Sequence, residues 1–271
     1  MTRTEQQERL IGMLLAESPQ NQALAASFPS GDAARRRLLR SLMNVRPPRP
    51  LDRSFLQLQD MFLSAEREER GTVDADALPP AAQDRRLVLW QGDITRLKAD
   101  AIVNAANSAL LGCFVPCHGC IDNAIHSAAG LQLREACARL MEEQGYPEPA
   151  GRAKLTAGYN LPARYVLHTV GPIVRGRVTR QDRKDLASCY RSCLALAAEH
   201  NLHSVAFCCI STGEFHFPNQ EAARIAVDTV ASFLNQQSTS IRRVIFNVFK
   251  DLDAGIYRAL LGPDQGAAPG P

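Results

Sequence analysis

The 271-residue sequence lacks several features that would assign it to a membrane or to a secreted scaffold. No apolar run approaches the roughly 20 residues that a membrane-spanning helix needs. The segment Leu10–Ala16 has the length of a signal-peptide core, but Glu5, Glu8 and Glu17 flank it, so we predict an amphipathic helix instead. The eight cysteines are scattered over helix-like and strand-like segments apart from one cluster, which is unlike a small disulfide scaffold. We therefore expect a protein of the reducing cytoplasm without a membrane partner.

The sequence also lacks a strong charge of either sign. Its net charge is only +3, and the basic residues are spread along the chain. Charge therefore gives no reason to expect nucleic acid as a partner. We expect a monomer.

The N-terminal part of the chain has the apolar period of helices. Asp32 and Asp52 are predicted N-caps of the second and third of these helices. A polar segment with two prolines, Gly71–Asp84, separates this part from the rest of the chain, and residues 1–84 are predicted as a helical extension with a linker. Apolar residues recur at three- and four-residue spacing in the stretches Leu10–Leu15, Leu38–Met43 and Phe55–Phe62.

From Arg86 onward, strand-like and helix-like segments alternate. This alternation predicts an α/β sheet covered by helices on both faces, over residues 85–262. The tail 263–271 consists mostly of Gly, Pro and Ala and is predicted to be disordered. We predict strands near residues 87–90, 101–103, 153–159, 165–170, 205–210 and 243–249, and helices near 120–144, with a break at Gly130, and near 181–200, 219–235 and 253–260.

One loop, between Asn104 and His126, contains more metal-binding chemistry than the rest of the chain. Cys113, Cys117, His118 and Cys120 lie within eight residues, and thiolate with imidazole is the ligand set that zinc prefers. Because all the candidates lie in one loop, three ligands with an open fourth position are favoured over a closed structural site. Free thiols are the alternative, and spacing alone leaves Cys117 as a possible ligand.

Three further features suggest contacts with a polar ligand, each with a simpler alternative. Asp93 with the backbone of Ile94 could hold a purine, although spacing alone favours a turn cap. The loop 211–218 precedes a predicted helix and could hold a diphosphate on its amides, or it could be a tight turn with two phenylalanines in the core. Asp122 could cap a helix or act on a ligand, and Asn107 could orient sugar hydroxyls.

The chain contains five motifs that belong together: Gly92–Thr95, Val103–Ser108, Ile121–Gly130, Thr169–Pro172 and Ile210–Gly213. In this order and spacing they resemble a macrodomain over roughly residues 85–262. The resemblance implies a three-layer α/β/α sandwich with a mixed, mostly parallel sheet that binds ADP-ribose. In place of the glycine-rich stretch usual in its hydrolytic branch, this chain has Cys113–Cys120. That replacement is similar to the zinc-dependent protein-ADP-ribose hydrolases, microbial proteins that also have an N-terminal helical extension.

The resemblance implies a role for each matching residue. It makes Cys113, His118 and Cys120 the zinc ligands, with Cys117 as a neighbour. Asn107 and Asp122 would hold the distal ribose and act in catalysis. Asp93 would accept the adenine amine, Ile94 would bind the adenine ring through its backbone, and the amides of two segments would hold the diphosphate. The implied substrate-binding set is Asp93, Ile94, Asn107, Ile121, Asp122, Ser211, Thr212, Gly213, Glu214 and Phe215.

The implied reaction removes ADP-ribose from an acidic side chain of a mono-ADP-ribosylated protein. Zinc would stabilise charge as a Lewis acid and lower the pKa of a water or hydroxyl group, while Asp122 would orient or deprotonate the nucleophile. Three alternatives stay open: a reader of ADP-ribose that breaks no bond, a deacetylase of O-acetyl-ADP-ribose, and zinc that only holds the loop together.

Overall fold

Six strands form the central sheet of the computed structural model, which describes residues 1–236 and 238–262. The strand order is β2-β8-β7-β4-β6-β5, and every neighbouring pair is parallel except β5 and β6. The predicted mixed, mostly parallel sheet is therefore confirmed. The tail predicted to be disordered lies outside the described residues. The strands are β2 (Leu87–Gln91), β4 (Ala101–Ala105), β5 (Ala153–Ala157), β6 (Tyr165–Thr169), β7 (Ser204–Phe207) and β8 (Arg243–Val248).

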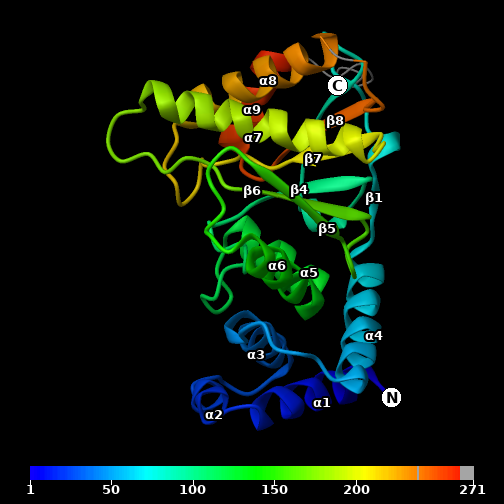
Figure 1. Ribbon diagram of the computed structural model, residues 1–271. Coiled ribbons are helices and arrows are strands. Elements are labelled where there is room, and N and C mark those ends of the chain that lie inside the picture. Colours follow the sequence, from blue (N-terminus) through cyan, green and yellow to red (C-terminus); the bar gives the residue numbers. More distant parts are fainter. Residues whose placement is uncertain (237, 263–271) are drawn as a thin grey trace.

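Helices cover both faces of the sheet, as Figure 1 shows. Helices α7 (Arg180–Glu199), α8 (Asn219–Gln236) and α9 (Asp251–Leu261) lie on one face, and α5 (Ile121–Ala129) and α6 (Leu131–Gln144) on the other. Every residue of β7 is buried because the strand is covered on both sides. The predicted helix break at Gly130 is present between α5 and α6. The strand predicted near 205–210 ends earlier, at Phe207.

Four helices form the N-terminal extension, which packs below α5 and α6 (Figure 1). Leu131 of α6 is buried within the extension's own apolar cluster, so the two parts share side-chain packing. The sequence analysis missed α2, whose eight residues carry little apolar periodicity. The helices are α1 (Arg3–Ala16), α2 (Pro19–Ala26), α3 (Asp32–Val45) and α4 (Arg53–Arg70).

The two predicted N-caps of the extension had different outcomes. Asp52 caps α4, because its side chain accepts from the backbone N–H of Ser54. The prediction for Asp32 is wrong: Gly31 occupies the N-cap of α3 without a side-chain hydrogen bond. Asp32 lies in the first turn, where its carboxylate accepts from Arg35. A carboxylate in this turn still interacts favourably with the helix dipole.

The segment predicted as a linker, Gly71–Asp84, is ordered against the sheet domain. Strand β1 (Val73–Asp74) pairs in parallel with β3 (Leu97–Lys98), and the 3₁₀ helix η1 (Ala75–Ala77) follows it. Ala75 and Ala81 are buried in the core around the sheet. This segment therefore attaches the extension to the sheet domain. In the part of the chain that the structure describes, no helix is both long and apolar enough to cross a membrane.

Candidate active site

The loops that carry the predicted site residues follow the carboxyl ends of three strands of the sheet, β2, β4 and β7. The loop after β4 contains Asn107 and the cysteine cluster, and the loop after β7 runs through residues 211–218. Strand β2 ends two residues before Asp93. Parallel strands place these loops at one edge of the sheet, where ligands bind in open α/β folds.

Asp122 and Asn107 lie side by side, as predicted for residues that act on one ligand. The Asn107 Nδ2 donates to Asp122 Oδ2 at 3.3 Å and to the carbonyl of Gly112 at 3.1 Å. Asn104 is buried beneath them and donates to Asp122 Oδ1 at 2.8 Å. Burial raises the pKa of Asp122 to about 6, although the bond from Asn104 acts against that rise. A carboxyl group with such a pKa can exchange a proton near neutral pH.

Cys113, His118 and Cys120 form a cluster that could hold a metal ion. Their ligand atoms all lie within 4.8 Å of one another, and the Cys113 Sγ is 3.7 Å from His118 Nδ1. Tetrahedral zinc, with bonds of about 2.3 Å to sulfur and 2.0 Å to nitrogen, needs ligand atoms roughly 3.5 Å apart. Burial, aided by the neighbouring Cys113, raises the pKa of the Cys120 thiol to about 12. A nearby cation would favour the thiolate, so the donor set fits zinc.

The second nitrogen of His118 faces a carboxylate from another loop. His118 Nε2 lies 3.8 Å from Glu214 Oε1, which belongs to the loop after β7. A carboxylate on the outer nitrogen is the usual partner of a metal-binding histidine, because it fixes the ring's orientation. Sequence analysis assigned Glu214 to ligand binding through its backbone and missed this side-chain contact.

Cys117 points away from the cluster and is held by the extension. Its backbone N–H donates to Asn44 Oδ1 at 2.9 Å, and its Sγ lies 3.3 Å from both Ser41 Oγ and the carbonyl of Arg37. Its φ of +51° is in the left-handed region, which non-glycine residues rarely adopt. The geometry therefore favours three ligands and makes Cys117 an anchor of the loop to α3.

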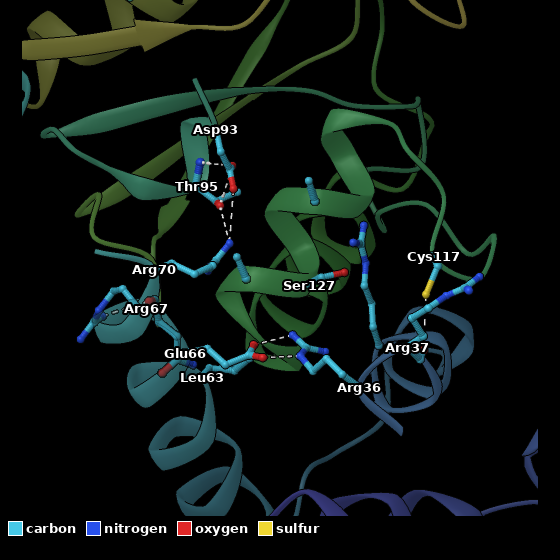
Figure 2. Close-up of a pocket in the computed structure, with 14 residues that line it drawn as sticks. Arg36, Arg37, Leu63, Glu66, Arg67, Arg70, Asp93, Thr95, Cys117 and Ser127 are labelled. Atoms are coloured by element: carbon cyan, nitrogen blue, oxygen red, sulfur yellow. Dashed lines mark hydrogen bonds and ion pairs between the residues drawn. The ribbon is translucent and has the colours of Figure 1, made fainter. Parts of the chain in front are cut away.

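Asp93 has the capping role that spacing alone favoured. Its Oδ1 accepts from the backbone N–H of Thr95 at 3.0 Å and from the Thr95 hydroxyl at 2.7 Å, which caps the 3₁₀ helix η2 (Ile94–Arg96). Its other oxygen lies 3.3 Å from Arg70 at the end of α4 (Figure 2). Ile94 is buried. One carboxylate oxygen of Asp93 is therefore used by the fold, and the other faces the extension.

The loop from Ser211 to Phe217 closes on itself and on the neighbouring loop. Phe217 donates its N–H to the carbonyl of Ser211, and Val174 donates to the carbonyl of Phe215. Ser211 approaches the loop after β6 so closely that a Cβ on Gly171 would lie 2.0 Å from its Oγ. Phe217 is 1% exposed and belongs to the core, whereas Phe215 is half-buried. Gly213 and Glu214 are exposed before α8 begins, so this part of the loop presents its backbone at the rim.

Two histidines, His126 and His168, lie buried below the site. His168 Nε2 lies 2.9 Å from Thr156 Oγ1, and its Nδ1 accepts from Asn104. His126 packs directly under residues 112–120, the loop that contains the candidate metal ligands (the metal loop), because a Cβ on Gly112 would lie 2.8 Å from its ring. The φ of Gly112, +79°, also requires glycine there. These histidines support Asp122 and the loop from below.

Comparison with known proteins identifies the family. The macro domain family model matches residues 103–226. A protein of Treponema medium named protein-ADP-ribose hydrolase is 48% identical over 263 residues, which cover 96% of this chain and 100% of that protein. The chain belongs to the macro domain family. A protein of Staphylococcus aureus with the same name is 48% identical over 258 residues, covering 95% of each chain.

The match of this macrodomain to one solved structure covers more of the chain than the sheet domain alone. The Trypanosoma brucei macrodomain in complex with ADP-ribose is 31% identical, with a TM-score of 0.62, and the match covers 90% of this chain and 96% of that one. The predicted family and its three-layer fold are thus confirmed, and the predicted extension is present as four helices. Three contacts at the site of this macrodomain were not predicted: Asn44 with Cys117, Arg70 with Asp93, and Glu214 with His118. The two residues of each pair lie far apart along the chain, so sequence patterns could not indicate them.

Proposed function

We propose that this macrodomain is a zinc-dependent hydrolase that removes mono-ADP-ribose from modified protein side chains, acting on Asp or Glu esters and releasing ADP-ribose. One observation carries the proposal: the Cys113–His118–Cys120 cluster shares its loop with Asn107 and leads directly into Asp122. The relatives from T. medium and S. aureus, both named protein-ADP-ribose hydrolase, support the class of reaction.

ADP-ribose would occupy the crevice at the carboxyl ends of the strands. Asp93 and the backbone of Ile94 would hold the adenine. The amides of Ile121 and Asp122, at the N-terminus of α5, and those of the loop 212–215 would hold the diphosphate, because helix N-termini present free N–H groups and positive potential. Asn107 and Asp122 would then face the distal ribose. The solved macrodomain complexes with ADP-ribose support this placement.

Each residue of the site would have a separate role in hydrolysis. Zinc, when bound, would supply Lewis-acid stabilisation of the charge that develops on an oxygen of the ester. Asn107 would orient the ribose through its amide, which Gly112 and Asp122 already position. Asp122, with its pKa raised to about 6 by burial, would accept a proton from the attacking group. Water adds across the ester bond, so the products are the free carboxylic acid and ADP-ribose.

A chelation experiment tests the proposal directly. The purified protein is incubated with a peptide that carries one ADP-ribosylated glutamate, and release of ADP-ribose is followed by chromatography before and after treatment with a strong chelator. We expect release that is lost with the metal and restored by added zinc. Absence of release from zinc-loaded protein would leave a reader, and release after complete removal of zinc would refute the role of the metal.

Two variants distinguish a proposed zinc ligand, His118, from its neighbour Cys117. His118→Ala should lose both bound zinc and turnover, whereas Cys117→Ser should keep one zinc per chain, because Cys117 points toward α3. Parallel rates on O-acetyl-ADP-ribose would show which ester is preferred. If His118→Ala keeps its thermal stability while turnover is lost, the zinc has more than a structural role.

A further inference from the structure

A cavity of about 510 Å³ lies between the extension and the outer face of α5. Figure 2 shows side chains from α3 and α4 on its two sides. The back wall is made of small residues of α5: Ala124, Ser127 and Ala128. Asp93 lines one end, and Cys117 of the metal loop lines another part. The cavity therefore borders both the expected adenine end of the site and the metal loop.

Five arginines line this cavity, and two carboxylates accompany them. Glu66 pairs with Arg36, and Asp93 pairs with Arg70 (Figure 2). The arginines are Arg36, Arg37, Arg40, Arg67 and Arg70. The lining therefore carries an excess of positive charge.

The remaining three guanidinium groups have no carboxylate partner within the described residues. Arg40 donates to the Asn123 side chain and to the carbonyl of His118, and Arg67 donates to the carbonyl of Asn160. Arg37 is exposed. The Nη1 of Arg36 is also buried without a hydrogen-bond partner, even though the rest of that group pairs with Glu66. Such donors favour an anionic ligand, because guanidinium groups bind carboxylates with two parallel hydrogen bonds.

We propose that this cavity binds an acidic segment of the modified protein, next to the residue that carries ADP-ribose. The proposal rests on the proposed function: a protein modified on Asp or Glu brings carboxylates to the site. The metal loop joins the two sites physically, since Arg40 of the cavity holds the carbonyl of the ligand residue His118. The extension thus supplies a surface that selects acidic substrates, and the crevice binds the ADP-ribose that all of them share.

Two matched peptides test this selection. Both carry one ADP-ribosylated glutamate, with flanks of glutamate in one and serine in the other. We expect the wild-type protein to prefer the acidic peptide by about tenfold in kcat/KM, because several charge pairs contribute. Arg37→Glu combined with Arg67→Glu should remove the preference and leave the rate on the serine peptide unchanged. Arg9→Glu with Arg191→Glu reverses the same charge at exposed positions outside the cavity and should keep the preference.

A binding measurement keeps this proposal separate from the hydrolase proposal. A fluorescent, unmodified hexaglutamate peptide is titrated with each variant, and its anisotropy is measured at two salt concentrations. We expect binding that weakens with salt and falls by about tenfold in the Arg37→Glu/Arg67→Glu variant. If no peptide is hydrolysed but hexaglutamate binds in this way, the proposed function fails and the acidic-segment site stands.

Three results would overturn the acidic-segment site. The first is hydrolysis of both peptides by the wild-type protein at an equal rate. The second is a preference that survives the Arg37→Glu/Arg67→Glu change. The third is saturable binding of inorganic phosphate at this cavity, lost in the same variant, with no binding of hexaglutamate; the cavity would then be a phosphate site. Thermal melting of every variant verifies that each one is folded.

Discussion

At the scale of single residues, the clearest physical constraint is the burial of ionisable groups beneath the site. His168 is fully buried, and burial lowers its pKa to about 3. The unfolded chain takes up a proton on this residue near pH 6.5, and the folded chain does so only near pH 3. Between these values the unfolded state binds more protons, so stability falls as the pH decreases through this window.

A substitution of His168 tests whether the burial of this histidine makes stability depend on pH. His168→Gln should reduce the loss of stability on acidification, by up to about 1.4 kcal/mol per pH unit. Urea unfolding between pH 7.5 and 4.5 measures this slope in both proteins. His200→Gln, at an exposed position at the end of α7, is the control and should keep the wild-type slope. Identical slopes in the His168→Gln variant and the wild type would contradict the assignment.

At the scale of elements, the metal loop depends on α3 for its conformation. The Asn44 side chain is buried, accepts from the backbone N–H of Cys117 and donates to the hydroxyl of Ser127 at 3.0 Å. One amide thus joins α3 to the loop and to α5. The left-handed φ of Cys117 needs such support, because that conformation is unfavourable for a residue with a side chain.

Removing this amide should affect both stability and metal binding. Asn44→Ala should lower the free energy of unfolding by about 1–3 kcal/mol, since it leaves buried polar groups unpaired. It should also weaken zinc binding, measured by competition with a coloured chelator. Gln22→Ala removes an exposed amide on α2 and should change neither value. Wild-type zinc affinity in folded Asn44→Ala would show that the loop holds its shape without α3.

At the scale of the whole molecule, the extension and the macrodomain form one structural unit. Arg134 of α6 is buried and donates to the carbonyls of Met43, Asn44 and Arg46 at the end of α3. Gln59 of α4 accepts from the backbone N–H of Leu131. Both contacts satisfy groups that would otherwise be buried without partners, so neither part is complete alone.

Removal of residues 1–70 tests whether the macrodomain depends on the extension for its stability. The shortened chain should melt at least about 10 °C lower than the full chain, because it loses the apolar contacts of Leu131 and the acceptors of Arg134. Differential scanning calorimetry measures the melting temperature. Two separate transitions in the full chain, or an unchanged temperature in the shortened one, would contradict a single cooperative unit.

The sequence predicted the fold and supplied most of the candidate site residues because both depend on local patterns. The alternation of strand and helix periods placed every strand of the main sheet, and Gly130 marked the break between α5 and α6. Cys113, His118 and Cys120 lie within one short stretch of sequence, which made them candidate metal ligands before any contact was known, and the structure brings their ligand atoms within 4.8 Å of one another. The wrong cap at Asp32 and the missed α2 arose where local signals were weak or where glycine took the capping position.

What the sequence by itself determined is the architecture, the family resemblance and a set of candidate residues for the expected ligand. Tertiary structure alone decided how those residues are used. It turned Cys117 toward α3 and brought Glu214 to His118. It also placed the arginines of the extension beside α5. These contacts join residues far apart along the chain, and only the packing of whole helices and loops sets such distances.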